Sequence, residues 1–134
     1  MAAERTPKTA PERVKRLLIV EDEVLVRMMI ADAARDAGYR VTEVHNADAA
    51  LSYLQSGRHV DLVFTDINMP GSLNGVELTK IVSAEYPDTR VIMTSGRVPA
   101  NAIQSVGPFI SKPYTIDDAL AVIDRMLNSH PSDG

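Results

Sequence analysis

The chain has 134 residues, of which 45% are hydrophobic and 24% are charged, with a formal net charge of −4. This size and composition are typical of one globular domain. The chain has no cysteine, which excludes disulfides, zinc–thiolate sites and cysteine nucleophiles. It also has no apolar run of membrane-spanning length and no charged-then-apolar secretory leader. We therefore expect a cytoplasmic protein without a membrane partner.

The charge is unevenly distributed along the chain. Residues 1–16 contain five basic and two acidic residues, a local charge of +3, so the rest of the chain carries −7. An acidic body argues against nucleic acid as a partner of the folded part. Residues 1–14 are expected to form a disordered leader, and residues 129–134 a frayed C-terminal tail.

Short β-branched runs alternate with helical patterns along the remainder, which predicts βαβ units and a parallel sheet. Several runs are apolar almost throughout, as expected for strands that are covered on both faces. The expected strands are 16–20, 39–44, 61–65, 90–94 and 108–111.

Helix signals lie between these strands. Residues 23–37 carry an apolar stripe that includes Met29 and Ile30, and Gly38 follows as a C-terminal cap. The methionines at 28, 29, 93 and 126 are all expected in the core. Three further helices have N-terminal caps at Asn46, at Asn74 with Glu77, and at Thr115 with Asp118.

The fourth intervening helix is the weakest of the predicted elements. Only residues 98–107 are available for it, with Pro99 near the start and Gly107 at the end. Helices of two turns or fewer are marginal in water. We expect a short or mobile fourth helix.

Charged and hydroxyl side chains follow four of the expected strands, and the carboxyl ends of parallel strands converge on one crevice. Glu21 and Asp22 follow the first strand, Asp66 the third, Ser95 the fourth and Lys112 the fifth. Clustered carboxylates repel one another unless a cation lies between them, and oxygen ligands favour a hard ion such as Mg²⁺. A lysine and a hydroxyl opposite them would hold an anion. This pattern predicts a phosphoryl site in which one carboxylate is the nucleophile.

Four sequence blocks strengthen this interpretation: LLIVEDE, LVFTDINMPG with NGVEL, VIMTSG and FISKPY. In this order they resemble the signature blocks of two-component response-regulator receiver domains, over about residues 15–128. The resemblance implies an α/β, flavodoxin-like, doubly wound fold. Its five-stranded parallel sheet would have the order 2-1-3-4-5, with helices on both faces. It also implies a stand-alone, single-domain bacterial response regulator with a receiver domain at 15–128.

The resemblance assigns a role to each acidic residue. Asp66 matches the phosphoacceptor, whose carboxylate takes a phosphoryl group from a phosphohistidine on a sensor histidine kinase or a histidine phosphotransfer protein. Glu21 and Asp22 match the acidic pair that, with Asp66 and the backbone carbonyl of Asn68, holds Mg²⁺. The first acidic position is glutamate rather than the more usual aspartate, which lengthens one ligand arm.

The resemblance also assigns the residues that respond to phosphorylation. Lys112 matches the lysine that pairs with the phosphoryl group, and Phe109 the aromatic switch residue. Thr94 and Ser95 both occupy the hydroxyl position, and Ser95 is favoured because Gly96 follows it.

Two further features of this region concern the backbone. Pro113 matches a proline that usually follows a cis peptide bond in the family. The interval from Ser95 to Lys112 is several residues shorter than usual, and the shortening falls on the fourth helix.

The function implied is a phosphoryl-accepting switch that acts through an unknown protein partner, or that drains phosphate from a kinase. We expect a monomer or weak homodimer, with Mg²⁺-dependent self-phosphorylation and autodephosphorylation but no turnover of an external substrate. One alternative is a phosphohydrolase of the haloacid-dehalogenase type, although that family needs an aspartate where this chain has Asn68. Others are a degenerate receiver that only binds partners, and a flavodoxin-like cofactor binder, which the acidic loop after the first strand disfavours.

Overall fold

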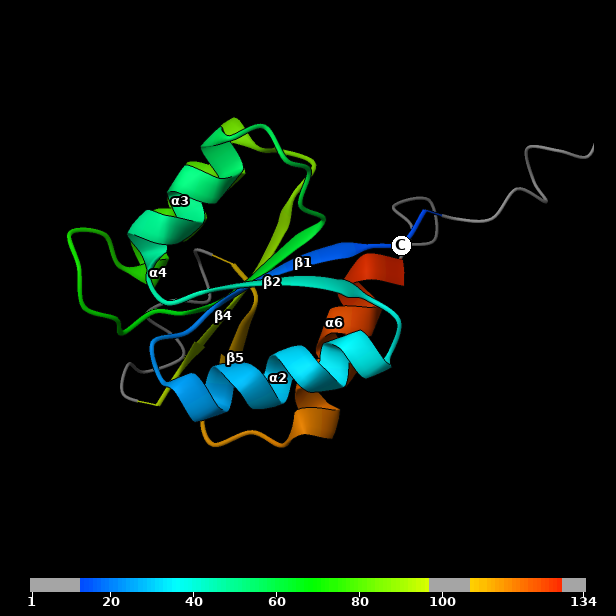
Figure 1. Ribbon diagram of the computed structural model, residues 1–134. Helices are drawn as coiled ribbons and strands as arrows, with labels where there is room; N and C mark the ends of the chain where they lie inside the picture. The colour runs from blue at the N-terminus through cyan, green and yellow to red at the C-terminus, as the bar shows by residue number, and fades with distance from the viewer. Residues whose placement is uncertain (1–12, 97–106, 129–134) are drawn as a thin grey trace, which may run out of the picture.

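The computed structural model describes residues 13–96 and 107–128, and these form a parallel sheet with helices on both sides (Figure 1). The strands hydrogen-bond in the order β2-β1-β3-β4-β5, which confirms the predicted fold and sheet order. The elements are β1 (Arg16–Val20), α2 (Val24–Asp36), β2 (Arg40–Val44), α3 (Ala47–Gln55), β3 (Leu62–Asp66), α4 (Gly75–Glu85), β4 (Arg90–Ser95), β5 (Phe109–Ser111) and α6 (Ile116–Asn128).

Three expectations fall on residues outside the described ranges. The short fourth helix expected over 98–107 lies almost wholly there, as do most of the N-terminal leader and the C-terminal tail. Within the described residues, no helix combines the length and the apolar character needed to cross a bilayer.

Alternate residues of the strands supply two cores, one on each face of the sheet. Leu17 and Ile19 of β1 pack in the core beneath α2 and α6, whereas Leu18 and Val20 pack in the core beneath α3 and α4. Figure 1 shows these two helix pairs on opposite sides of the strands. The central strand β3 is buried along its whole length. The residue that ends this strand, Asp66, therefore has little freedom of position.

Three of the predicted helix starts are confirmed by their capping bonds. The side chain of Asn46 accepts from the backbone N–H of Ala49 at 2.8 Å. Asn74 and Glu77 form a reciprocal capping box, with both bonds at 2.9 Å. Thr115 caps α6 in the same way through the N–H of Asp118. Such caps contribute about 1 kcal/mol each and set where a helix begins.

The predicted buried face of α2 was partly wrong. The residues it buries are Ile30, Ala31 and Ala34, whereas Met28 and Met29 are 44% and 57% exposed. Small alanines let α2 approach the sheet closely, and the helix turns about 100° per residue, which carries the two methionines outward. The apolar pattern of this helix fits two overlapping faces, and packing selected one of them. Met93, by contrast, is fully buried as expected.

Candidate functional site

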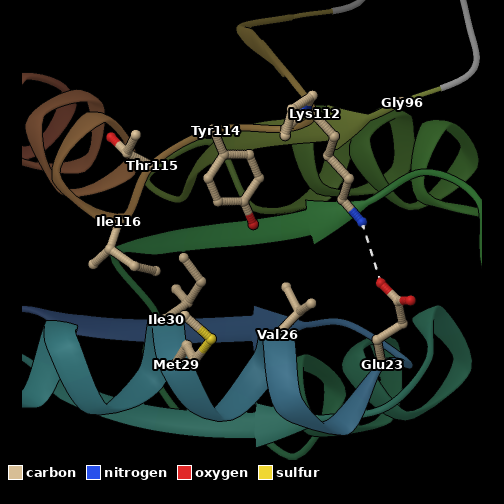
Figure 2. A pocket seen from close by; sticks show the side chains of 10 residues that line it. Glu23, Val26, Met29, Ile30, Gly96, Lys112, Tyr114, Thr115 and Ile116 are labelled. Carbon is tan, nitrogen blue, oxygen red and sulfur yellow. Dashed lines mark ion pairs between the residues drawn. The ribbon is translucent and has the colours of Figure 1, made fainter.

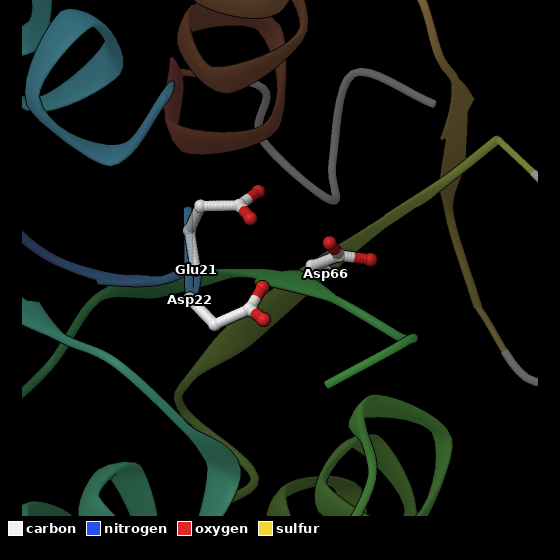
Figure 3. Close-up of side chains that lie close together, drawn as sticks. All are labelled: Glu21, Asp22 and Asp66. Atoms are coloured by element: carbon white, nitrogen blue, oxygen red, sulfur yellow. The ribbon is translucent and has the colours of Figure 1, made fainter. Parts of the chain in front are cut away.

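The carboxyl ends of β1 and β3 bring three acidic residues together. Oxygen atoms of Glu21, Asp22 and Asp66 lie within 4.8 Å of one another (Figure 3). Glu21 and Asp66 are buried, with 4% and 5% of their surface exposed. The predicted acidic cluster is therefore present.

Lys112, which follows β5, reaches into this cluster. Its Nζ lies 2.9 Å from Asp66 Oδ2 and 3.3 Å from Glu21 Oε1, and 3.9 Å from Glu23 Oε1. Burial alone would lower the lysine pKa, but the hydrogen bond and charge of Asp66, together with Glu21, raise it well above its ordinary value. Lys112 is thus a permanent cation. The peptide bond between it and Pro113 is cis, as the family resemblance implies.

The electrostatics of the cluster favour a further cation. The pKa of Glu21 is raised to about 7, chiefly by burial and also by the negative charge of Asp66. The hydrogen bond from the backbone N–H of Glu23 and the positive charge of Lys112 act in the opposite direction. One lysine thus faces an excess of carboxylates. Carboxylate oxygens are the donors that Mg²⁺ prefers, and it usually binds through one or two of them. The residues present therefore fit a magnesium ion.

The backbone around Asp66 holds its side chain in place. The N–H of Asn68 donates to Asp66 Oδ1 at 3.0 Å, and the other oxygen, Oδ2, accepts the hydrogen bond from Lys112. Gly75, the first residue of α4, packs directly against the end of β3. A Cβ atom at this position would lie 2.4 Å from the carbonyl oxygen of Asp66 and 2.6 Å from Ile67 Cα. Sequence reasoning missed this requirement, although the glycine after the Asn74 cap was visible in the NGVEL block.

Both candidate hydroxyls lie near Asp66, in different settings. Thr94 is the register partner of Asp66 across β3 and β4. Its Oγ1 is buried, and no residue of the described ranges hydrogen-bonds to it. Ser95 Oγ accepts a hydrogen bond from Asn68 Nδ2 at 2.8 Å. The sequence offered both residues and favoured Ser95, and the sheet register, which pairs Thr94 with Asp66, keeps Thr94 as a candidate.

Phe109 lies in β5, in register with Met93, and not among the charged groups. Its half-buried ring packs on the core beneath α3 and α4. This position is compatible with both packing and a switching role.

Two hollows open beside the acidic cluster. One, of about 470 Å³, is lined by Asp22, Glu23, Asp66, Asn68, Gly96 and Lys112. The other, of about 640 Å³, is a mostly apolar groove between α2 and the segment after β5 (Figure 2). The side chain of Tyr114 lines the apolar groove and extends toward α2 (Figure 2). Its hydroxyl has no hydrogen-bond partner in the described part of the chain. The charged hollow contains the acidic cluster, and the groove adjoins it through the shared lining residues Glu23, Gly96 and Lys112.

Comparisons with known proteins agree with this geometry. A family model for the response regulator receiver domain matches residues 17–124. The response regulator receiver protein CpdR of Brucella abortus is 30% identical over 119 residues, which are 85% of this chain and 98% of that protein. The nitrogen assimilation regulatory protein NtrX of Azorhizobium caulinodans is 33% identical over 119 residues, and the match spans only 26% of its length.

Solved structures give the same result for the fold. The chemotaxis response regulator CheY4 of Vibrio cholerae superposes with a TM-score of 0.77 at 27% identity, covering 86% of this chain and 100% of that one. The parallel sheet, the acidic pocket with its lysine and the family match lead to one conclusion. The chain belongs to the response regulator receiver domain family, the phosphoryl-accepting signalling switches of two-component systems.

Proposed function

We propose that Asp66 is the phosphoacceptor of this switch, and that its phosphodonor is a phosphohistidine on a histidine kinase or a histidine phosphotransfer protein. The observation that carries the proposal is the convergence of Asp66 and Lys112 at 2.9 Å in a hollow that opens to solvent beside Glu21 and Asp22. This arrangement presents a carboxylate nucleophile next to a fixed positive charge.

We propose that Mg²⁺ binds the carboxylates of Glu21, Asp22 and Asp66, with the backbone carbonyl of Asn68 as a further ligand. The bound ion would neutralise negative charge on the phosphoryl oxygens and on the acids around them. The depth of Glu21 supports this assignment, because a buried carboxylate with a raised pKa gains most from a nearby cation.

In the transfer step, a carboxylate oxygen of Asp66 attacks phosphorus and forms the acyl phosphate. The P–N bond to the donor histidine breaks, and its electron pair stays on the imidazole nitrogen. Lys112 exchanges its contact with Asp66 for one with a phosphoryl oxygen. Since Lys112 is charged before and after the step, it stabilises the transferring group without a proton transfer.

The change of state is proposed to pass through the hydroxyls at the end of β4. Ser95 is the residue predicted from the sequence, and its bond to Asn68 supports a role in placing the loop after Asp66. The buried, unpartnered hydroxyl of Thr94 supports it as the group that turns toward the phosphoryl oxygen. Either movement would vacate space for Phe109, the proposed aromatic switch residue, to change rotamer.

We propose that the phosphodonor protein docks on the first two turns of α2 and on the apolar groove beside it. Leu25 is 75% exposed and Met29 57% exposed, and with the exposed Val24 and Met28 they form a group of apolar side chains of the kind that marks interaction sites. Met29 lines the groove beside the acidic hollow (Figure 2), and Leu25 lies one turn before it on α2. The downstream partner is proposed to be another protein. The cytoplasmic location and the monomeric or weakly dimeric state stay predictions.

The phosphohydrolase alternative needs a second carboxylate two residues after the nucleophile. That position is Asn68, and its side-chain amide donates to Ser95. An amide cannot protonate a leaving group, so the arrangement favours a switch over a turnover enzyme.

Incubation with a small phosphodonor and Mg²⁺, followed by intact-mass measurement, tests the proposal. We expect one phosphate adduct on the wild type and none on Asp66→Asn. Asp36→Asn, an exposed aspartate at the end of α2, is the matched control and should be phosphorylated normally. Phosphate release over many turnovers without an adduct would instead support the phosphohydrolase.

A further inference from the structure

Two arginines begin neighbouring strands at the end of the sheet opposite the acidic cluster. Arg16 begins β1, Arg40 begins β2, and the two are register partners in this parallel pair. Both are exposed, and within the described residues neither guanidinium group forms an ion pair. Like charges directly opposite one another on neighbouring strands are destabilising. Such a pair indicates a place where an anion is expected.

A third guanidinium group completes the cluster. Arg58, two residues beyond the end cap of α3, lies over the ring of Tyr53 at 5.9 Å from the ring centre. The Tyr53 hydroxyl is tied to Thr42 of β2 at 3.2 Å. Arg16, Arg40, Arg58, Tyr53 and His59 together line a concavity of about 380 Å³, which we call the arginine pocket.

Among residues 13–96 and 107–128, no carboxylate forms an ion pair with any of these three arginines. Asp61 is engaged by the backbone N–H of Arg16 at 2.7 Å, by His59 at 2.8 Å and by Arg13 at 3.6 Å. Glu43 pairs with Arg27 at 3.2 Å and with Arg35 at 3.0 Å.

Helix dipoles explain only part of the positive charge. The carboxyl ends of α2 and α3 lie at this end of the sheet, and cations are favourable near the carboxyl end of a helix. This accounts for Arg35, in the last turn of α2, and for Arg58 beyond α3. It does not account for Arg16 and Arg40, which are strand residues and sit side by side at a cost.

We propose that the arginine pocket binds a small phosphate-bearing anion with at least two negative charges, of the class of a diphosphate or a nucleoside diphosphate. Guanidinium forks match phosphate oxygens in a bidentate way. A volume of about 380 Å³ suits a small ligand rather than a polymer, and the net charge of −4 disfavours an extended nucleic acid. The arginine pocket and the acidic cluster lie at opposite ends of β1, which is roughly 15 Å long.

The first test uses inorganic pyrophosphate as the probe, with the full chain, in the presence of EDTA so that no metal bridges it to the acids. Backbone amide spectra should show saturable shifts centred on residues 16, 40 and 58–59. Arg16→Gln and Arg40→Gln should each weaken binding by roughly tenfold or more, as expected for a lost hydrogen bond to a charged group. Each variant should also lose the rise in thermal midpoint that the probe gives the wild type.

Two matched variants remove a positive charge elsewhere. Lys80→Gln, at an exposed position of α4, and Lys112→Gln should bind pyrophosphate as the wild type does. If Lys112→Gln abolishes binding, the anion binds at Lys112 beside the acidic cluster and not in the arginine pocket, and the proposal is wrong. Equal weakening by all four variants would mean diffuse charge attraction and would also overturn it.

Two further probes distinguish the sources of phosphate. Adenosine diphosphate should bind at least as tightly as pyrophosphate, with added shifts at Tyr53 if the base contacts the ring. Short single-stranded DNA should bind more weakly at physiological salt. Tighter binding of the DNA, or no saturable binding of pyrophosphate in the millimolar range, would contradict a small-anion site.

Discussion

The ammonium group of Lys112 lies 2.9 Å from the carboxylate of Asp66 and 3.3 Å from that of Glu21. The lysine proposed to contact the transferred phosphoryl group is thus already the counter-ion of a buried acidic pair. The proposed Mg²⁺ ion would bind the same two carboxylates. The contributions of the lysine and the ion to stability should therefore depend on each other.

Lys112→Gln should lower the free energy of unfolding in EDTA by about 1–3 kcal/mol, because two buried carboxylates lose a charged hydrogen-bond partner. Added Mg²⁺ should raise the thermal midpoint of this variant more than that of the wild type. Thermal unfolding with and without Mg²⁺ measures both effects. Lys80→Gln is the control, and an equal response of both variants to Mg²⁺ would show that lysine and metal act independently.

The two hydroxyls at the end of β4 can be separated by substitution. Thr94→Val keeps the shape of the side chain and removes only the buried hydroxyl, so phosphorylation by a small donor should persist. The phosphorylation-induced shifts of amide resonances around Phe109 should be lost in this variant. Ser95→Ala should instead alter the lifetime of the phosphate, because it frees the amide of Asn68. If Ser95→Ala alone abolishes the spectral change, Ser95 is the switching hydroxyl, as the sequence suggested.

Gly75→Ala should destabilise the protein by at least 2 kcal/mol, the upper part of the usual range for overpacking. The new methyl group would meet the backbone of Asp66 and Ile67 at 2.4 and 2.6 Å, and backbone cannot move aside as a flexible side chain does. Urea unfolding measures the loss. Gly107→Ala is the control, since its Cβ would meet only side-chain atoms at 3.6 Å or more. A similar stability for the two variants would show that the end of β3 is less fixed than the packing indicates.

Leu25→Ser should slow phosphotransfer from a phosphorylated kinase or phosphotransfer protein by roughly tenfold. The rate with a small phosphodonor should not change, since Leu25 does not line the acidic hollow. Stability should stay within about 0.5 kcal/mol, because the side chain is 75% exposed. Parallel rate measurements with both donors test this. Equal slowing with both donors would place the effect on the chemistry and not on docking.

Asp61 should make the stability of the protein depend on pH in the acid range. Burial alone would raise the Asp61 pKa, but the Arg16 N–H, His59 and Arg13 hold it below its ordinary 3.8. A carboxyl group whose pKa is lowered by folding stabilises the protein at pH values above its pKa in the unfolded state. This stabilisation is lost as the pH falls through its pKa in the folded state. Asp61→Asn should therefore cost about 1–3 kcal/mol at neutral pH and progressively less below about pH 4. A constant difference from the wild type across that range would contradict the assignment.

The local patterns in the sequence determined which elements form and where several of them begin. Apolar runs such as residues 62–65 marked a strand covered on both faces, and the Asn74–Glu77 pair marked a helix start. These features depend on backbone hydrogen bonding and side-chain periodicity within a few residues. They can therefore be recognised from the sequence without a structure. The family blocks then linked strand ends far apart in the chain, so that Glu21, Asp66 and Lys112 were identified as neighbours.

Other features were decided by tertiary packing. The rotation of α2 turned Met28 and Met29 outward, because close approach of alanines to the sheet outweighed burial of longer side chains. The register of β3 with β4 placed Thr94 beside Asp66, and the register of β1 with β2 placed Arg16 beside Arg40. The amino acid sequence specifies which side chains a strand presents to each face. Which residue of a neighbouring strand each one meets depends on how the strands align, and only the assembled sheet fixes that alignment.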